Sequence, residues 1–297
     1  MEFSKKCCVI ALDIGGTFIK YGLVLSGNSI VFDEQVPANS HDSKEEILNR
    51  FAMVIKKCIR VAEENALVVE GIAVSTPGPF DYKAGTSHMV GKYDEIYGID
   101  LRKEFRTRAE LLDTLPIEFM QDAAAFLFGE YVIGAAKGYD NCMGVILGTG
   151  TGYACIKDGK LLLNEHKGPY YVLARQEYKN TGKLIEEIVS GTAILRNYEE
   201  DAKSLAKKAL GGDYKAIKIF HELGKILGEA LSEVKEIEDT QCLVIGGQIS
   251  KDFALLENGI TEGLGKYADK IKITKAVYPA NAALIGASTM LRKQTKL

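Results

Sequence analysis

CCVIALDIGGTFIK, residues 7–20, is the stretch that decides the fold of this chain. It opens with a short apolar run that contains β-branched residues, and Asp13-Ile14-Gly15-Gly16-Thr17 follows. The apolar pattern resumes at 19–25 and, after the turn residues Ser26-Gly27-Asn28, at 29–32. Short apolar runs separated by tight, glycine-containing turns predict three antiparallel strands.

The same order of elements returns in the second half of the chain. The apolar run CMGVIL at 142–147 leads into Gly148-Thr149-Gly150-Thr151-Gly152, and further apolar runs at 153–156 and 160–163 flank a turn at 157–159. The two copies lie about 130 residues apart, whereas solenoid repeats have periods of roughly 20–50 residues. Together with a length of 297 residues, this repetition predicts two similarly built domains.

Helices and further strands are predicted around the two copies. Ser43 and Glu46 have the spacing of a capping box, and apolar residues recur at helical intervals over 47–62. Other helical patterns lie at 123–131, 185–198, 214–234 and 280–293, and other strand patterns at 68–75, 117–120 and 242–245. No Ser/Pro-rich linker separates the halves in the sequence, so we expect the domains to pack around a cleft.

Charge and composition narrow the classes of protein. The chain has 37 Lys and Arg against 40 Asp and Glu, and the net charge of −3 leaves no global basic field for nucleic acid. No window approaches the ~18 apolar residues of a membrane span, and the run at 7–12 is too short for a signal-peptide core. The six cysteines lie in apolar patterns without a Cys-x-x-Cys pair. We expect a cytoplasmic protein with reduced cysteines, no structural zinc, and neither nucleic acid nor a membrane as partner.

Three predicted strands end in glycine-rich turns, Asp13–Thr17, Gly148–Gly152 and Gly246–Gln248. Glycine lets backbone N–H groups face phosphate oxygens without an obstructing Cβ, and threonine adds a hydroxyl donor. A tight hairpin explains any one turn equally well, but three turns, two of them in matching places of the repeat, favour a nucleotide phosphate site. None has the G-x-x-x-x-G-K-[ST] or G-x-G-x-x-G spacing, which disfavours a P-loop or Rossmann site.

Two carboxylates end strands beside these turns. Asp13 precedes the first turn, where it would orient Mg²⁺ or its waters against the phosphates. Asp122 lies at a strand-to-helix junction, where it would serve as an N-cap, as a general base, or as both, since a helix N-terminus also keeps a carboxylate ionised. Phosphoryl transfer to an alcohol needs such a base, Mg²⁺ and donors around the transferred group.

The ordered set of motifs resembles that of the ROK family of sugar kinases, within the actin–hexokinase superfamily. Val9–Lys20 is similar to the family's first phosphate motif, Leu147–Gly152 to its second, and Ile245–Gly247 to its adenosine segment. Gly71–Pro79 resembles the sugar-side segment with the sequence PGP. Gln121–Ala125 stands where the family carries Asn-Asp-Ala-Asn-Ala, whose Asp is the general base. The resemblance covers nearly the whole chain.

This resemblance implies the fold and the domain organisation. The expected fold is α/β, with two ribonuclease-H-like (actin-like ATPase) domains around an interdomain cleft. The N-terminal domain is expected at 1–118, joined by the final helix within 280–297, and the C-terminal domain at 119–279. A homodimer is common in the family, and the sequence leaves the oligomeric state open.

The resemblance also implies roles for individual residues. Asp122 is the expected catalytic base, and Asp13 is the expected ligand of the metal. Contacts with Mg-ATP are assigned to Asp13, Gly15, Gly16, Thr17, Lys20, Gly148, Thr149, Gly150, Thr151, Gly246 and Gly247. Contacts with the sugar are assigned to Pro77, Gly78, Gln121 and Glu165.

The sugar side departs from the family pattern. Most relatives carry a Gly-Glu-x-Gly-His segment and a Cys-rich zinc cluster where residues 164–191 of this chain contain no cysteine. The chain therefore resembles the zinc-free branch, which includes β-glucoside kinases and glucokinases. Glu165 and His166 are adjacent, which is the wrong spacing for the sugar-contacting pair. Met89–Tyr93 replaces an Asn-Leu-x-x-Trp sugar segment, and the chain has no tryptophan. The tyrosines expected to line the sugar pocket instead are Tyr93, Tyr97, Tyr170 and Tyr171.

We therefore expect ATP- and Mg²⁺-dependent phosphorylation of a hexose or hexose derivative. The alternative is a catalytically weak sugar-binding or sugar-sensing ROK relative, which the disrupted Glu165-His166 segment favours. ROK repressors carry a DNA-binding module before the kinase-like body, and the early position of Asp13 leads us to expect none here. The sequence leaves open which hydroxyl is phosphorylated and whether the sugar is a free hexose, an N-acetylhexosamine or a β-glucoside.

Overall fold

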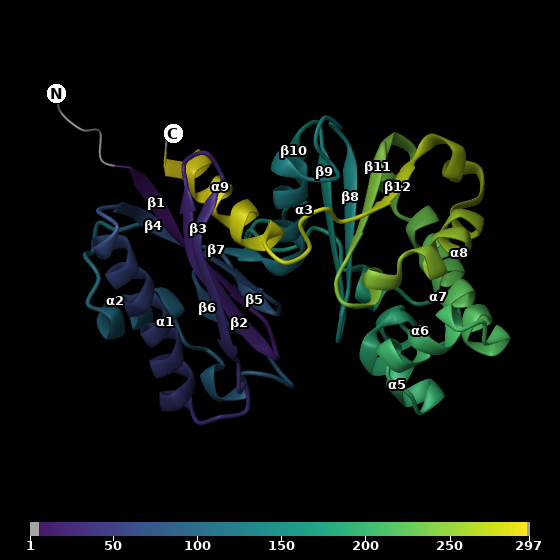
Figure 1. The fold of residues 1–297 in the computed structure, drawn as a ribbon, viewed down its shortest axis with the longest axis horizontal. Helices are drawn as coiled ribbons and strands as arrows, with labels where there is room; N and C mark the ends of the chain where they lie inside the picture. Colours follow the sequence, from purple (N-terminus) through teal and green to yellow (C-terminus); the bar gives the residue numbers. More distant parts are fainter. Residues whose placement is uncertain (1–5, 296–297) are drawn as a thin grey trace. The chain divides into compact units, whose positions relative to one another are not determined.

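The computed structural model describes residues 6–295, which form two compact units (Figure 1). Within these residues the first unit consists of 6–129, 163–168 and 280–295, and the second of 130–162 and 169–279. Each unit contains one five-stranded mixed sheet with helices packed against it. The chain therefore repeats one α/β architecture twice, as the two copies of the strand pattern predict.

The sheet of the first unit joins the predicted hairpins to two parallel strands. In spatial order its strands are β3 (Ile30–Pro37), β2 (Phe18–Leu25), β1 (Cys7–Ile14), β4 (Val68–Thr76) and β7 (Ile117–Gln121). The three strands β1 to β3 are antiparallel, which confirms the sequence prediction, and β4 and β7 run parallel to β1. The expected boundary after residue 118 falls inside β7, which pairs with β4 of the first unit.

Helices cover both faces of this sheet. The predicted capping box of Ser43 and Glu46 is present at the start of α1 (Lys44–Glu64), and Phe51 belongs to the apolar cluster that joins α1 to the sheet. The final helix α9 (Ala282–Thr295) returns to contact β1, β2, β4 and β7. Its Leu291 reaches the sheet at Gly71, where a Cβ would lie 3.0 Å from the leucine side chain. Glycine at this position of β4 therefore allows the helix to approach the strand.

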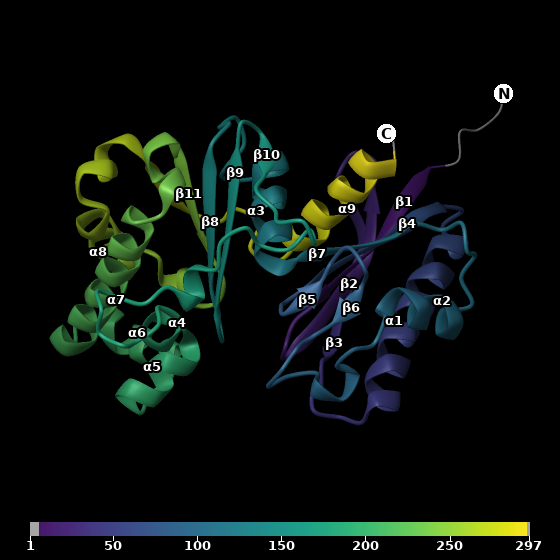
Figure 2. The same cartoon turned by 180° about the vertical axis from the view of Figure 1, so that it is seen from behind.

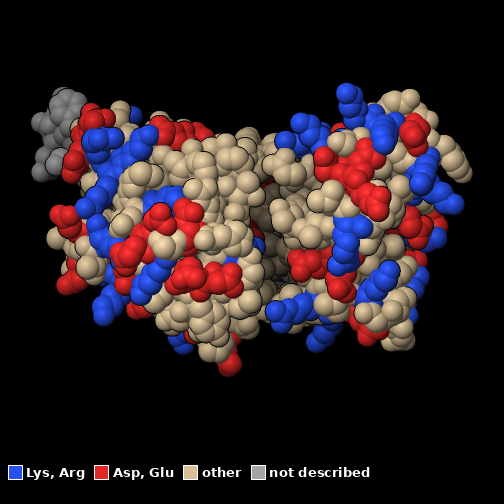
Figure 3. Space-filling view, turned by 90° about the horizontal axis from the view of Figure 1, so that it is seen from below, with Lys and Arg blue, Asp and Glu red and all other residues tan. Residues whose placement is uncertain are grey.

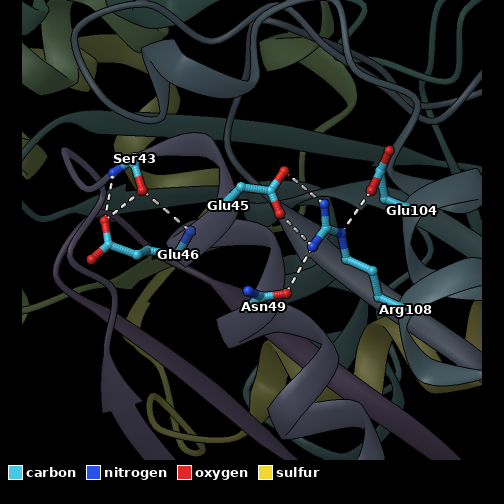
Figure 4. Close-up of polar contacts among 6 residues, drawn as sticks. All are labelled: Ser43, Glu45, Glu46, Asn49, Glu104 and Arg108. Carbon is cyan, nitrogen blue, oxygen red and sulfur yellow. Dashed lines mark hydrogen bonds and ion pairs between the residues drawn. The ribbon is translucent and has the colours of Figure 1, made fainter.

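A second helix of the first unit, α2 (Leu101–Ala109), was not predicted. Its sequence LRKEFRTRA presents buried apolar residues only at Leu101, Phe105 and Ala109, among charged neighbours, so the apolar period is weak. Polar contacts fix α2 against α1 (Figure 4). The Arg108 guanidinium donates to Glu45 at 2.9 Å and to Asn49 at 2.7 Å, both on α1, while its Nε lies 2.8 Å from Glu104 of its own helix.

The second unit repeats the strand order of the first (Figure 2). In spatial order its strands are β10 (Lys160–Leu161), β9 (Thr151–Lys157), β8 (Cys142–Leu147), β11 (Cys242–Gly246) and β12 (Lys272–Lys275). The strands β8, β9 and β10 are antiparallel, and β11 and β12 are parallel to β8. The predicted antiparallel copy is confirmed, and in both units the central strand is the one that precedes a glycine-rich turn.

The helical half of the second unit differs from the prediction, which lacks α6 (Ala202–Leu210) and α8 (Ala254–Leu264). The single helix expected over 185–198 is two helices, α4 (Glu186–Val189) and α5 (Gly191–Tyr198). They are separate because Ser190 is extended and caps α5 by accepting a 3.1 Å hydrogen bond from the Ala193 N–H.

The remaining elements belong to both units. They are the helices α3 (Asp122–Ile133), α6 (Ala202–Leu210), α7 (Tyr214–Ser232) and α8 (Ala254–Leu264), the small strands β5 (Phe80–Asp81) and β6 (Thr86–Ser87), and the 3₁₀ helices Asp94–Ile96, Leu173–Arg175, Lys235–Asp239, Ile249–Asp252 and Gly265–Lys270.

Glycines bring two pairs of helices into backbone contact. A Cβ on Gly259 of α8 would lie 2.0 Å from the carbonyl oxygen of His221 on α7. A Cβ on Gly286 of α9 would likewise lie 1.9 Å from the carbonyl oxygen of Ala125 on α3. The high glycine content therefore has a second origin beside the strand-end turns, since only glycine permits these crossings.

The surface carries charges of both signs. On the face drawn in Figure 3, Lys and Arg are intermixed with Asp and Glu over each unit, in keeping with the net charge of −3. Among residues 6–295, no helix is both long and apolar enough to cross a membrane.

Candidate active site

The carboxyl ends of three parallel strands bring the two predicted carboxylates to one edge of the first sheet. Asp13 of β1 is paired in register with Ser75 of β4, and Thr76 of β4 is paired with Gln121 of β7. Asp122 follows Gln121 directly. These residues come from three separate parts of the sequence and occupy successive register positions at one edge of the sheet, and we call them the strand-end row.

Asp13 is half-buried and hydrogen-bonded within this row. The Ser75 hydroxyl donates to its Oδ1 at 2.7 Å. Burial raises the pKa of Asp13 above its ordinary value, the Ser75 hydrogen bond and the Lys20 charge oppose that rise, and the charge of Asp122 adds to it. The carboxylate keeps its second oxygen for a ligand, which suits an ion that binds oxygen.

Asp122 is the first residue of α3, at the helix end where the sequence predicts it. Its Oδ1 accepts a 2.7 Å hydrogen bond from the Ala123 N–H. Burial raises the pKa of the Asp122 carboxyl, while the nearby charge of Lys92 and the backbone hydrogen bond oppose the rise. A carboxylate with a raised pKa at a rigid helix N-terminus has the properties of a general base.

The first glycine-rich turn connects β1 to β2 as a tight hairpin. The Gly15 N–H donates to the carbonyl oxygen of Phe18 at 3.0 Å, and a Cβ on Gly15 would lie 2.9 Å from that oxygen. Gly16 and Thr17 are exposed at its tip. Lys20 lies opposite Asp13 on β2, and its Nζ donates to the carbonyl oxygen of Ala280 at 3.2 Å. The hairpin reading is therefore correct, and it leaves the tip open to a ligand.

The segment Met89–Tyr93, which the sequence analysis assigned to the sugar side, lies over this turn. The Tyr93 hydroxyl donates to the carbonyl oxygen of Gly15 at 2.9 Å, and a Cβ on Gly16 would lie 3.5 Å from Cδ of Lys92. The only sequence signal was the departure of residues 89–93 from the family pattern. The structure thus places a lysine against the turn, and its charge opposes the rise in the Asp122 pKa.

The predicted sugar side contains buried polar atoms without a partner. Thr76 Oγ1 and Gln121 Oε1 are buried and make no hydrogen bond within the described part of the chain. Leaving such a group unsatisfied costs about 1–3 kcal/mol, so a partner supplied by a ligand would be favourable. Beside them Pro77 is buried and Gly78 exposed, and the Tyr82 hydroxyl, which donates to the Thr76 carbonyl oxygen at 3.2 Å, lies 3.3 Å from where a Gly78 Cβ would be.

Glu165 and His166 lie on the 163–168 loop, which belongs to the first unit. The Glu165 side chain is 88% exposed, and its carboxylate lies 3.6 Å from Nε2 of His166. Nδ1 of His166 lies 3.3 Å from Asp81, and its carbonyl oxygen accepts a hydrogen bond from the Lys83 N–H at 3.1 Å. The structure thus connects this loop to the segment after the PGP turn, and the sugar contact of Glu165 stays a prediction.

The four candidate tyrosines have different surroundings. Tyr93 is buried against the first turn, and Tyr97 is 60% exposed. In the second unit the Tyr170 hydroxyl donates to Glu236 at 2.6 Å, and the Tyr171 hydroxyl donates to Gln176 at 2.7 Å.

The second glycine-rich turn is supported by the start of α5. The Gly191 N–H donates to the carbonyl oxygen of Gly148 at 2.7 Å, and the Thr192 hydroxyl donates to that of Thr149 at 2.9 Å. A Cβ on Gly191 would lie 2.8 Å from the Gly148 oxygen, whereas a Cβ on Gly148 would meet no atom within 4 Å. Thr151 Oγ1 is buried without a partner among the described residues.

An exposed carboxylate that no sequence motif indicates faces this second turn. Oε1 of Glu186, on α4, accepts a 3.1 Å hydrogen bond from the Thr151 N–H. The same oxygen lies 2.6 Å from where a Cβ on Gly150 would be. The Glu186 carboxylate therefore occupies the Thr151 N–H, a donor that the sequence analysis assigned to a phosphate oxygen.

The third turn has a packing reason for its glycine. Gly247 has a φ of +88° and a Cβ there would lie 2.3 Å from the carbonyl oxygen of Leu147, the residue before Gly148. Gly246 pairs with Ile146 in the sheet. Gly247 therefore allows the ends of β8 and β11 to approach each other, and its contact with adenosine stays a prediction.

The residues present fit a magnesium ion held partly by phosphates. Mg²⁺ commonly binds through one or two carboxylates, with waters and substrate phosphates completing its shell. Asp13 offers one such carboxylate beside the first turn. Among residues 6–295 no group of three or more His, Cys, Asp or Glu is arranged to hold a metal ion by itself.

Known proteins are similar to this chain over almost its full length. It is 24% identical to a glucokinase of Thermotoga maritima, with 97% of this chain and 98% of that protein covered. It is 24% identical to an N-acetylmannosamine kinase of Escherichia fergusonii, with 95% and 97% covered. The fold matches the crystal structure of a ROK family glucokinase from Streptomyces griseus in complex with glucose and AMPPNP, with a TM-score of 0.80 and 23% identity over 96% of this chain and 99% of that chain.

The family pattern of the ROK proteins matches residues 9–294, which include both sheets, all three glycine-rich turns and the Asp13 to Asp122 row. The expected α/β, actin-like fold agrees with the solved structure named above. The chain belongs to the ROK family.

Proposed function

We propose that this protein is an ATP- and Mg²⁺-dependent kinase that phosphorylates a hydroxyl group of a hexose or hexose derivative. The observation that carries the proposal is the strand-end row at the sheet edge, where Asp122 directly follows Gln121 and both Gln121 and its strand partner Thr76 have buried polar atoms without a partner among the described residues. A base adjacent to unsatisfied hydrogen-bonding groups is what a polyhydroxylated acceptor requires. The relatives named above, a glucokinase and an N-acetylmannosamine kinase, agree with this substrate class.

Asp122 takes the proton of the attacking hydroxyl in this proposal. The hydroxyl oxygen forms a bond to the γ-phosphorus of ATP, and the bond from that phosphorus to the β,γ-bridging oxygen breaks, with its electron pair leaving on ADP. Burial favours the proton on Asp122 by raising its pKa, and the rigid helix start holds the carboxylate in place. Pro77, Gly78 and Gln121 line the acceptor side, and Glu165 is a further candidate contact.

The nucleotide is assigned to the glycine-rich turns. Gly15, Gly16 and Thr17 from the first unit and Gly148–Thr151 from the second would hold phosphate oxygens, and Gly246-Gly247 would contact the adenosine. Asp13, held by Ser75, would orient Mg²⁺ or its waters. Bound Mg²⁺ would offset the negative charge of the phosphates during transfer.

One observation favours a second function, sugar binding or sensing with weak catalysis. The high exposure of the Glu165 side chain shows that a carboxylate expected to contact the sugar is not enclosed by the first unit. Loss of this sugar contact is compatible with a relative that binds or senses a sugar and catalyses weakly.

A coupled assay of ADP release across a sugar panel tests the proposal. The panel contains glucose, N-acetylmannosamine, N-acetylglucosamine and a β-glucoside such as cellobiose, each with ATP in the presence and absence of Mg²⁺. We expect Mg²⁺-dependent ADP release with at least one sugar and a phosphorylated product in mass spectrometry. Binding of a sugar without stimulated ADP release would support the sensing relative instead.

Asp122→Asn tests the base within the same assay. We expect kcat to fall by roughly 10²–10⁴ because a positioned general base contributes that much. Asp113→Asn, in an exposed loop of the same unit, is the matched control and should retain wild-type turnover. Near-normal turnover of Asp122→Asn would remove Asp122 from the mechanism.

A further inference from the structure

Lys92 belongs to a short segment that hydrogen bonds hold over the first glycine-rich turn. The Tyr93 hydroxyl donates to the Gly15 carbonyl oxygen at 2.9 Å, and the Tyr93 N–H donates to the Ser40 carbonyl oxygen at 2.9 Å. Asp94 closes the segment by accepting a 2.8 Å hydrogen bond from the Gly91 N–H. The backbone around Lys92 is therefore fixed from both sides relative to the turn.

The side chain of Lys92 lies against the first glycine-rich turn. Its Cδ lies 3.5 Å from where a Cβ on Gly16 would be, so the aliphatic part covers the glycine. The side chain is half-buried. Its charge also acts on the Asp122 carboxyl, whose pKa it lowers. Lys92 therefore lies against the turn assigned to phosphate, and its charge acts on the base assigned to the acceptor.

The ammonium group of Lys92 has no protein partner among residues 6–295. Neither a hydrogen bond nor an ion pair of its Nζ is present there, whereas Lys167 of the same unit pairs with Glu118 at 3.0 Å. A half-buried lysine that makes no ion pair is unusual, because enclosing its charge is unfavourable unless an anion in direct contact offsets it. The arrangement is that of a cation prepared for an anionic ligand.

We propose that Lys92 is a catalytic residue, whose ammonium donates a hydrogen bond to an oxygen of the γ-phosphoryl group during its transfer. This inference rests on the proposed kinase function. The transferred group must lie within reach of the phosphate turn it leaves and of the hydroxyl that Asp122 deprotonates. Lys92 lies against that turn, and its unpaired ammonium is available to the group in transit.

The proposed role of Lys92 has an electrostatic reason, because catalysis brings two negatively charged groups close together. The Asp122 carboxylate and the γ-phosphoryl group are both negative, and catalysis brings them to either side of one hydroxyl oxygen. As that oxygen bonds to phosphorus and its proton moves to Asp122, the electron pair of the broken bond leaves with ADP. A cation next to both anions offsets their repulsion and keeps the phosphoryl group aligned.

Turnover of Lys92→Met tests the proposal against a merely structural role. Methionine keeps the length and apolar contact of the side chain but removes the charge, and Lys103→Met, on the exposed side of α2, makes the same charge change away from the site. We expect kcat to fall about 10²-fold, the size of effect seen when one preorganised donor is removed, with the sugar KM unchanged. Lys92→Arg should recover part of kcat. An unchanged kcat, or a change confined to the sugar KM, would overturn the proposal.

Nucleotide binding gives a readout that does not depend on turnover. Isothermal titration of AMPPNP and of ADP compares ligands that differ by the γ-phosphoryl group. We expect Lys92→Met to weaken AMPPNP binding about tenfold and to leave ADP binding unchanged, whereas Lys103→Met changes neither. Equal weakening of both ligands, or of neither, would contradict the contact.

The two experiments separate this proposal from the kinase function on which it rests. If the wild-type protein releases no ADP with any sugar, the kinase function fails, while the AMPPNP and ADP comparison still decides whether Lys92 contacts the γ-phosphoryl group. If the wild-type protein is an active kinase and Lys92→Met is equally active, only the Lys92 role fails. Thermal unfolding should be nearly unchanged in Lys92→Met, since the ammonium has no protein partner to lose in the described structure.

Discussion

Ser75 donates a hydrogen bond of 2.7 Å to Oδ1 of Asp13, across neighbouring parallel strands and 62 positions of sequence. The two residues are paired in register at the carboxyl ends of β4 and β1. The hydrogen bond opposes the rise in the Asp13 pKa that burial causes. Ser75 therefore fixes the rotamer of the proposed metal ligand and favours its ionised form.

Ser75→Ala should weaken the use of Mg²⁺. Without the hydroxyl, the Asp13 carboxylate loses its orientation and part of the support for its charge, and the Mg²⁺ concentration that gives half-maximal rate should rise roughly tenfold. Ser288→Ala is the matched control, because Ser288 is an equally buried serine whose hydroxyl donates within α9 to the Leu284 carbonyl oxygen. The same Mg²⁺ dependence in both variants would show that Ser75 does not support a metal ligand.

Asp122→Asn should make the protein more stable at neutral and alkaline pH. The pKa of Asp122 is raised in the folded state, so this carboxyl stabilises the fold below its unfolded-state pKa and loses that contribution as the pH rises through the folded-state pKa. Removing the charge should raise the unfolding temperature at pH 8 by roughly 2–4 °C, or ~1 kcal/mol. Thermal unfolding from pH 4 to pH 8 measures the effect, and a gain that does not grow with pH would refute it.

Glu186→Gln should strengthen ATP binding. The Glu186 carboxylate accepts the Thr151 N–H hydrogen bond at 3.1 Å and places a negative charge where the phosphates are proposed to bind. Neutralising it should lower the KM for ATP about threefold to tenfold, more strongly at low than at high salt. Glu257→Gln, at an exposed position of α8, controls for the change in net charge, and an unchanged or higher KM in Glu186→Gln would count against a phosphate site at this turn.

Gly286→Ala should destabilise the fold. The added methyl group would lie 1.9 Å from the Ala125 carbonyl oxygen, so α9 and α3 would have to move apart. We expect a loss of about 1–3 kcal/mol or more in the free energy of unfolding. Gly27→Ala, where a Cβ meets no atom within 4 Å, should be nearly neutral in denaturant titration. Similar midpoints for the two variants would mean that the helices do not cross as closely as described.

Gly148→Ala should separate stability from nucleotide binding. A Cβ on Gly148 would meet no protein atom within 4 Å, so the unfolding midpoint should stay close to that of the wild type. The methyl group would occupy the open side of the turn, and the affinity for AMPPNP should fall at least tenfold if phosphate oxygens approach the backbone there. Wild-type affinity together with wild-type stability would argue that the turn serves only as a hairpin.

Much of the fold could be predicted because its signals are local. The capping box at Ser43 and Glu46 and the apolar strand Cys142–Leu147 are present as predicted, since a cap and a period of side chains depend on residues a few positions apart. The prediction failed at 185–198, where an extended Ser190 separates two helices. It also missed α2, whose few apolar residues are hidden among charged ones, and the helices α6 and α8.

The candidate site could be predicted in part. The glycine-rich turns and the strand-end carboxylates Asp13 and Asp122 were visible, because strand ends and turn residues leave a mark on the sequence. Glu186 was not visible, and Lys92 was visible only as part of the Met89–Tyr93 segment that departs from the family pattern. Each becomes relevant where the fold brings it against a turn. Gly247 was visible but has a role the sequence did not indicate, which is the close approach to Leu147.

The sequence by itself determined the repeated order of strand, turn and strand, and the placing of carboxylates and glycines at the ends of strands. Those features follow from backbone preferences and side-chain periodicity among near neighbours. Only the tertiary structure decided which distant residues meet: Ser75 with Asp13, Glu186 with Thr151, and α9 with α3 at Gly286. These contacts depend on sheet register and helix crossings, which the packing of the whole chain fixes and no short stretch of sequence encodes.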